Sequence, residues 1–183
     1  MSESVPIKDV LYGRIDVIGQ DEINKLLLKK EFSQLFEIIF EKAINEIDDN
    51  FDENEKYGTL AESITHYLFT EMLIPSQRKI FYENIELDMV IPNTLELKKN
   101  TKNTIIIFFV KTDNMKEIHK RISEFKSIHE KDDNIWIISK KPLDIQQRSY
   151  VTNSASFGKF LQDAQDFIKT KKMNKLNIFK TDV

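Results

Sequence analysis

Residues 104–111, Thr-Ile-Ile-Ile-Phe-Phe-Val-Lys, decide the fold of this 183-residue chain. Positions 105–110 are all apolar and either β-branched or aromatic, which is the composition of a strand. A strand that is apolar on both faces is typical of the centre of a sheet covered by helices on both sides. Lys111 ends the run, so the sequence predicts a charged side chain at the end of a buried central strand.

A second buried strand follows after one helix. Asp113 and Asn114 are suited to cap a helix, and residues 115–128 carry apolar side chains at helical spacing. Residues 135–138, Ile-Trp-Ile-Ile, then predict another strand. A helix between two such strands is a crossover, which favours parallel pairing and a right-handed connection.

Upstream of the central strand, residues 85–91 alternate between apolar and other side chains. Ile85, Leu87, Met89 and Ile91 are expected to form one apolar row, with Asp88 pointing away from it. Residues 78–82 predict one more strand before this one. An aspartate and a lysine on neighbouring strands can form a site for metal and phosphate, or a simple ion pair at the strand ends.

A helix is expected before these strands. Residues 59–62, Thr-Leu-Ala-Glu, have the form of a capping box, in which Thr59 is the N-cap and Glu62 reaches back to its amide. The order helix, three strands, helix, strand indicates an α/β fold. We expect a three-layer α-β-α sandwich with a mixed central sheet.

The flanking regions are read as helices and loops. Residues 21–47 predict one long amphipathic helix, interrupted near Lys29 and Lys30, whose stripe packs on the domain or against a partner. Residues 48–55 and 92–103 are expected to be loops, and a short strand at 149–152 precedes a final helix. The division is an N-terminal helical extension, 1–57, and an α/β core, 58–183. The stripe, which ends at Ile47, contains seven apolar residues: Leu28, Phe32, Leu35, Phe36, Ile39, Ala43 and Ile47.

Composition limits the classes of protein. The chain has no cysteine, which excludes disulfides and thiolate chemistry, and no window approaches the ~18 uninterrupted apolar residues of a membrane span. The N-terminus lacks the pattern of a secretory signal. A soluble cytoplasmic protein without a membrane partner is therefore the expectation.

Positive charge is concentrated in two places although the net charge is −3. Such groups either contact the phosphates of DNA or RNA or form solvated surfaces. The first group is Lys98, Lys99 and Lys102, and the second, in the C-terminal tail, is Lys169, Lys171, Lys172, Lys175 and Lys180.

The order of elements, with Glu62 in the first helix, Asp88 in the second strand and Lys111 after the third, resembles the PD-(D/E)xK nuclease superfamily, which has the restriction-endonuclease-like fold. The resemblance covers residues 58–139 and rests on short motifs. It implies catalytic roles for Glu62, Asp88 and Lys111, and an Mg²⁺ ion held by Asp88 and Glu62. Family members act on DNA or RNA.

Phe109 departs from that pattern, because it stands where the resemblance implies a second carboxylate. An aromatic ring offers Mg²⁺ no oxygen ligand. The expected function is therefore a nuclease-like protein that binds nucleic acid, with impaired or lost metal-dependent hydrolysis. One alternative is an active Mg²⁺-dependent DNA endonuclease in which Glu62 or Glu86 supplies the missing acid. Another is an interaction subunit that forms a homodimer or binds a protein partner through its N-terminal stripe.

Overall fold

A mixed sheet of five strands, in the order β1-β2-β3-β4-β5, forms the centre of the molecule. This computed structural model describes residues 6–47 and 50–178, and side chains through residue 171. β1, β2 and β3 are antiparallel neighbours, whereas β3, β4 and β5 run parallel. The strands are β1 (Gln77–Tyr82), β2 (Ile85–Ile91), β3 (Ile105–Phe109), β4 (Ile135–Ser139) and β5 (Arg148–Val151).

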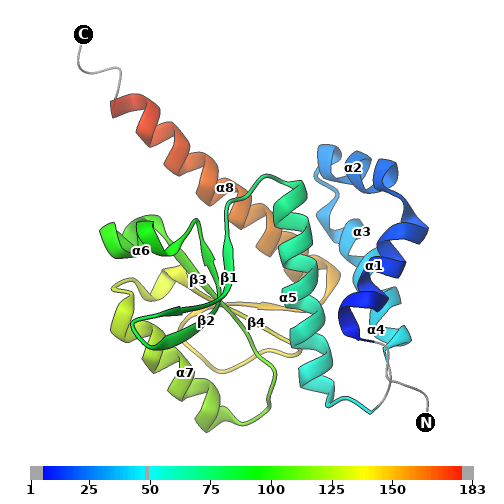
Figure 1. Cartoon of the computed structure of the whole chain (residues 1–183), viewed down its shortest axis with the longest axis horizontal. Coiled ribbons are helices and arrows are strands. Elements are labelled where there is room, and N and C mark those ends of the chain that lie inside the picture. Colours follow the sequence, from blue (N-terminus) through cyan, green and yellow to red (C-terminus); the bar gives the residue numbers. More distant parts are fainter. Residues whose placement is uncertain (1–5, 48–49, 179–183) are drawn as a thin grey trace.

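Helices cover both faces of this sheet (Figure 1). In β3, Ile105, Ile107 and Phe109 join a core with α5 (Glu53–Glu71) and α8 (Ser154–Ile178). The alternate residues Ile106 and Phe108 join a second core with α7 (Met115–Ile128). The predicted three-layer α-β-α arrangement and the buried central strand are confirmed. Between β3 and β4 the chain forms α7 and a short 3₁₀ turn, η3 (Asp132–Asn134), whereas a loop joins β4 to β5.

The N-terminal region is a set of short helices, so the prediction of one long helix over 21–47 is wrong, but the predicted interruption near Lys29 and Lys30 is confirmed. Lys30 adopts a left-handed backbone with φ of 58°, which ends the second helix and turns the chain. Leu28 is 86% exposed, so it does not belong to the buried stripe. The elements are α1 (Ile7–Ile18), α2 (Gln20–Lys29), α3 (Phe32–Phe36), the π-helical turn η1 (Glu37–Glu41) and α4 (Lys42–Glu46).

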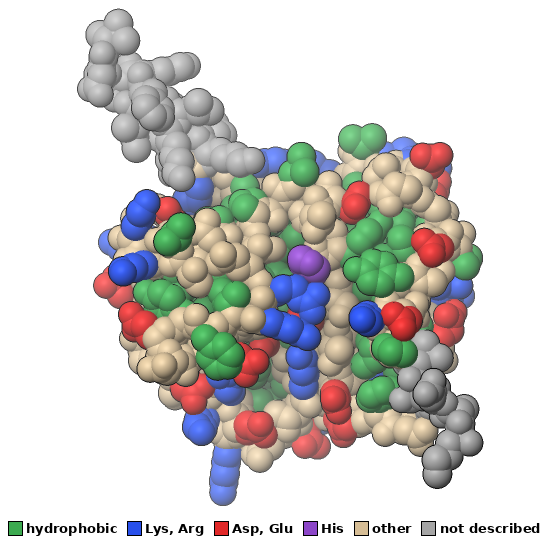
Figure 2. Space-filling model, in the orientation of Figure 1, with side chains coloured by type: hydrophobic (Ala, Val, Ile, Leu, Met, Phe, Trp, Pro, Cys, Tyr) green, Lys and Arg blue, Asp and Glu red, His purple; other side chains and the backbone are tan. Residues whose placement is uncertain are grey.

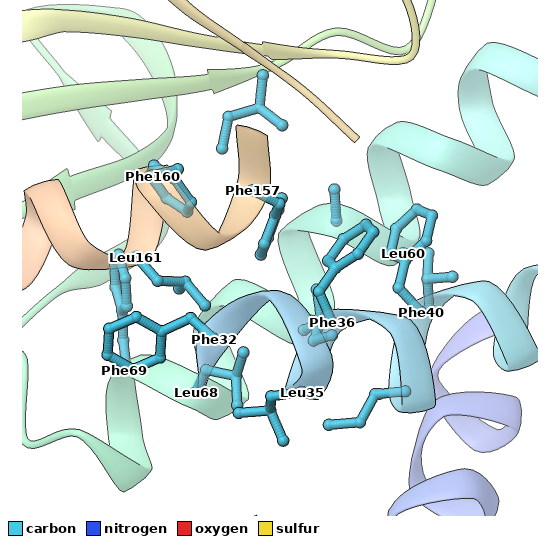
Figure 3. Packing of buried hydrophobic residues seen from close by; sticks show 14 of the residues in the cluster. Phe32, Leu35, Phe36, Phe40, Leu60, Leu68, Phe69, Phe157, Phe160 and Leu161 are labelled. Carbon is cyan, nitrogen blue, oxygen red and sulfur yellow. The ribbon is translucent and has the colours of Figure 1, made fainter. Parts of the chain in front are cut away.

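The rest of the stripe packs inside the molecule (Figure 3). Phe36 stacks on Phe40 with 4.4 Å between ring centroids, and its ring lies 4.6 Å from that of Phe157 in α8. Gly158 allows α8 to lie this close to α3, since a Cβ at position 158 would lie 2.5 Å from Ser33 Oγ. The N-terminal helices share one core with α5 and α8. The expected boundary at residue 57 therefore falls inside α5 and does not separate two cores.

Two segments expected to be loops contain helix. α5 begins at Glu53, where the Asp52 side chain accepts hydrogen bonds from the next amides, so the capping box at Thr59 is wrong. Residues 48 and 49 of that expected loop lie outside the described residues. Residues 92–103 contain α6 (Thr94–Lys99) and a 3₁₀ turn, η2 (Thr101–Asn103). None of the helices in the described ranges has both the length and the apolar character needed to cross a membrane.

Candidate functional site

The β1–β2 hairpin is kinked halfway along its length. In β2, Leu87 packs into the α7 core, but Met89 packs into the core beneath α5. Residues two apart on a regular strand share a face. The prediction of a single apolar row is therefore wrong, because the apolar side chains of β2 change faces at Asp88. Across the hairpin, Lys79 has a left-handed φ of 50°. This kink turns Arg78 and Lys79 toward α5.

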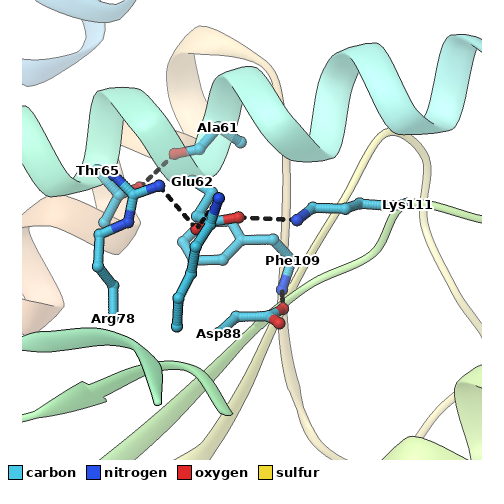
Figure 4. A network of polar contacts seen from close by, with 8 residues as sticks. Ala61, Glu62, Thr65, Arg78, Asp88, Phe109 and Lys111 are labelled. Carbon is cyan, nitrogen blue, oxygen red and sulfur yellow. Dashed lines mark hydrogen bonds and ion pairs between the residues drawn. The ribbon is translucent and has the colours of Figure 1, made fainter. Parts of the chain in front are cut away.

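Glu62 is the buried centre of a group of charged side chains (Figure 4). Its side chain is 1% exposed, and its Oε2 accepts a hydrogen bond of 2.8 Å from Lys111 Nζ. Its Oε1 accepts one of 3.0 Å from Arg78 Nη2 and lies 4.0 Å from Lys79 Nζ. Charge-assisted hydrogen bonds of this kind compensate a carboxylate for the loss of water. We call Glu62, Arg78, Lys79 and Lys111 the Glu62 cation cluster.

Gly58 allows α5 to lie directly on the end of β3. A Cβ at this position would lie 2.5 Å from the Val110 carbonyl oxygen and 2.6 Å from Lys111 Cγ. Gly58 is one helical turn before Glu62, so the same contact that needs glycine also places the Lys111 side chain beside the carboxylate. A glycine inside a helical pattern was the sequence signal for such a close approach.

Asp88 makes a separate contact where β2 and β3 diverge. Their paired register ends at Met89 and Ile107, and just beyond it the Phe109 N–H donates a 2.8 Å hydrogen bond to Asp88 Oδ2. Burial raises the pKa of Asp88 to about 6, although the Phe109 amide and the Lys111 charge act in the opposite direction. Asp88 thus completes the backbone hydrogen bonding at the point of divergence.

An open cleft lies beside Asp88, where β2 begins and β3 ends. It encloses about 380 Å³ and is lined by Asp88, Glu86, Glu117, Lys111 and Arg121, among others. The Arg121 guanidinium donates to the Glu86 carbonyl oxygen at 2.6 Å and lies 4.8 Å from the centre of the Phe125 ring. Glu86 therefore lines the same cleft as Asp88.

The polar residues predicted for catalysis are close together but are bonded to other groups. Lys111 pairs with Glu62 rather than with Asp88. Both oxygens of Glu62 face cations, and Phe109 is a 1% exposed core side chain. Within the described residues no three His, Cys, Asp or Glu side chains gather closely enough to hold a metal ion. As they stand, these residues do not fit an Mg²⁺ site, which needs several oxygen ligands in near-octahedral geometry.

The lysine groups predicted to bind nucleic acid lie away from this cluster. Lys98 and Lys99 end α6, and Lys102 lies in η2, so all three precede β3, whereas Lys111 follows it. The distal part of α8 extends away from the body of the molecule (Figure 1). There, Lys169 donates to Gln165 and Lys171 lies over the ring of Phe167. The side chains of Lys172 and Lys175, and the whole of Lys180, lie outside the described part of the chain.

Arg78 and His66 complete the surroundings of Glu62, and sequence reasoning missed the first of them. Arg78 Nε and His66 Nδ1 are buried atoms without a hydrogen-bond partner in the described structure. His66 lies one turn after Glu62, where burial and then the Arg78 charge lower the pKa of its imidazole. Arg78 and His66 therefore each have one ring or guanidinium nitrogen that is not hydrogen-bonded to Glu62.

Comparisons with protein-family models, with curated proteins and with solved structures find no match to this chain. The resemblance to the PD-(D/E)xK superfamily accordingly stays a prediction from the order of elements and the positions of Glu62, Asp88 and Lys111. What the structure adds is the cation cluster itself: three basic side chains gathered around one buried acid.

Proposed function

We propose that this protein binds nucleic acid through the Glu62 cation cluster and does not cleave it by a metal-dependent reaction. One observation carries the proposal: a single buried carboxylate faces three cations, which leaves an excess of positive charge. Arg78, Lys111 and Lys79 have side-chain exposures of 28%, 35% and 62%, so an outside ligand can reach them.

The chemistry of the cluster suits phosphate. A guanidinium presents several donors in a fixed fork, and lysines add mobile point charges. Lys79, whose side chain is 62% exposed, presents its ammonium group to such a ligand. Figure 2 shows lysine and arginine side chains gathered at the centre of one face, between α5 and the sheet. A local basic surface of this kind supports binding to a polyanion even when the whole chain is slightly acidic.

The same contacts argue against hydrolysis. A metal-dependent nuclease needs carboxylate oxygens free to bind the ion that polarises the phosphate. Glu62 directs its oxygens at cations, Asp88 accepts from an amide, and position 109 holds a phenyl ring. The active endonuclease with a relocated acid is therefore the less favoured reading. The interaction subunit is less favoured too, because its proposed surface, the N-terminal stripe, is mostly buried in the core.

The test is binding of fluorescein-labelled DNA and RNA, measured by anisotropy between about 20 and 200 mM salt. Lys79→Gln should weaken binding and reduce the slope of log K against log salt by about 0.7–0.9, the loss of one phosphate contact. Lys159→Gln is the matched control, because that lysine is 68% exposed on α8 and also faces a carboxylate. Failure of every probe to bind at low salt, or equal effects of the two substitutions, would overturn the proposal.

Cleavage is measured on the same preparation. Supercoiled plasmid incubated with Mg²⁺ or Mn²⁺ should remain intact over hours. Rapid nicking that Asp88→Ala abolishes would instead establish an active enzyme.

A further inference from the structure

We propose that the cleft between α1, α5 and β1 holds one nucleotide of a single-stranded nucleic acid, with its base against Tyr12 and its phosphate on Arg78 and Lys79. The proposal rests on the proposed function and deepens it, since it names the form of nucleic acid. The cleft encloses about 490 Å³, within the roughly 300–1,000 Å³ of small-ligand sites.

One wall of this cleft is apolar and aromatic. Leu11 is buried and anchors α1 in the core, whereas Tyr12 beside it lines the cleft and is 52% exposed. Phe51 is half-buried and lines the cleft as well. In the view of Figure 2, hydrophobic side chains lie over the N-terminal helices next to the central basic group. An aromatic side chain left open to solvent offers a face on which any base can stack.

The opposite wall belongs to the cation cluster. Arg78 and Lys79 line the cleft and also face Glu62, so the apolar wall and the proposed phosphate contacts adjoin. Lys8 of α1 adds a third positive charge, while Glu55 is the one carboxylate among the described residues of the wall. The excess of positive charge in the lining complements a phosphodiester.

Stacking and charge together favour a single strand. In a duplex the bases are stacked inside the helix and present only their edges, so a base cannot lie flat against Tyr12 without being flipped out. In a single strand each base has an accessible face, and aromatic platforms beside a basic groove are the usual means of binding it. A duplex would reach the exposed lysines but not the cleft.

The test compares binding of a fluorescein-labelled 12-nucleotide oligothymidylate with that of a duplex of equal length, using the full chain at low salt. Tyr12→Ala should weaken single-strand binding by about tenfold or more, whereas Tyr12→Phe should retain it, because the ring is kept. Phe81→Ala is the matched control: Phe81 is 74% exposed on β1 but does not line the cleft. Duplex binding should be weaker and indifferent to Tyr12→Ala.

The outcomes separate the two proposals. If Lys79→Gln weakens binding but Tyr12→Ala behaves like Phe81→Ala, the cluster binds nucleic acid and the single-strand cleft is refuted. Equal affinity for duplex and single strand refutes it as well. If no probe binds, both proposals fail. Circular dichroism and thermal melting of each variant verify that the fold is intact.

Discussion

Replacing Glu62 with glutamine tests whether the cation cluster holds α5 to the sheet. The substitution keeps the size of the side chain but removes its charge, and the new amide NH₂ group must face a lysine or an arginine, neither of which can accept a hydrogen bond. Removing one partner of a fully buried ion pair costs about 3–5 kcal/mol. Here the cations are 28–62% exposed and can turn to water, so we expect a loss of about 2–3 kcal/mol.

The assay is reversible urea unfolding of wild type, Glu62→Gln, Lys111→Met and the double variant. For a chain of this length the expected loss lowers Tm by about 5–10 °C. The Glu62 and Lys111 substitutions should be coupled by about 1–2 kcal/mol, because each removes the same 2.8 Å contact. Glu46→Gln is the control, since Glu46 pairs with Arg14 at 3.5 Å and is 50% exposed; its effect should stay within about 0.5 kcal/mol.

Two results would refute this reasoning. Additivity of the Glu62 and Lys111 effects within about 0.5 kcal/mol would mean that the two side chains do not interact in the folded protein. A Glu62→Gln variant as stable as wild type would mean that the carboxylate is not buried against its cations. The same variant should bind single-stranded DNA more tightly at low salt, because the cluster loses its only negative charge.

The remaining predictions concern Asp88, Gly58 and Phe109. The pKa of Asp88 is raised by burial to about 6, so the native state binds the proton more tightly than the unfolded chain, and stability should fall as the pH rises from about 4 to 6 and then level off. Asp88→Asn keeps an acceptor for the Phe109 amide. It should raise the free energy of unfolding at pH 7.5 by up to about 3 kcal/mol, with no gain at pH 4. A difference between variant and wild type that stays constant from pH 4 to pH 7.5 in urea titrations would contradict the raised pKa of Asp88. Gly58→Ala should lower the unfolding free energy by about 1–3 kcal/mol through overpacking, whereas Gly13→Ala in α1, which meets nothing within 4 Å, should be neutral or stabilising in the same melts. Phe109→Asp should be destabilised without metal and show an Mn²⁺-dependent rise in Tm larger than that of wild type; no such rise would count against an ancestral metal site.

The strands of this fold could be predicted because their signal is local. β2 was predicted with its observed bounds and β3 to within one residue, since β-branched and aromatic runs suit a buried sheet wherever they occur. The crossover helix between β3 and β4 follows from its own spacing and cap. None of these inferences required knowledge of a distant contact.

The start of α5 shows a signal that was present but misread. Asp52 followed by Glu53 and Glu55 is a helix N-terminus, with a capping side chain and acids in the first turn. The acidic density of the segment and the apparent capping box at Thr59 favoured a loop there instead. The error mattered for function, because a Glu62 that caps a helix has no need of Arg78 or Lys111.

The partners of Glu62 could not be predicted, because a backbone irregularity brings them together. Lys79 adopts φ of 50°, a conformation that lysine rarely takes, and nothing in its neighbours signals it. Regular alternation along β1 would place Arg78 and Ile80 on one face. In the structure Arg78 contacts α5 while Ile80 packs with the α7 core, so the arginine reaches a carboxylate that lies on a helix sixteen residues earlier.

Phe109 and the cation cluster are parts of one arrangement. A carboxylate at position 109 would lie two residues from Lys111, on the same face of β3, and would compete with Glu62 for its ammonium group. With a phenyl ring there, Glu62 is the carboxylate bonded to Lys111 and to Arg78, and its burial to 1% exposure requires that it keep them. Under the predicted resemblance, Phe109 therefore does more than stand in place of a metal ligand. It leaves Lys111 bonded to Glu62 in a cluster whose three cations are partly exposed, which suits the proposed binding of phosphate better than its cleavage.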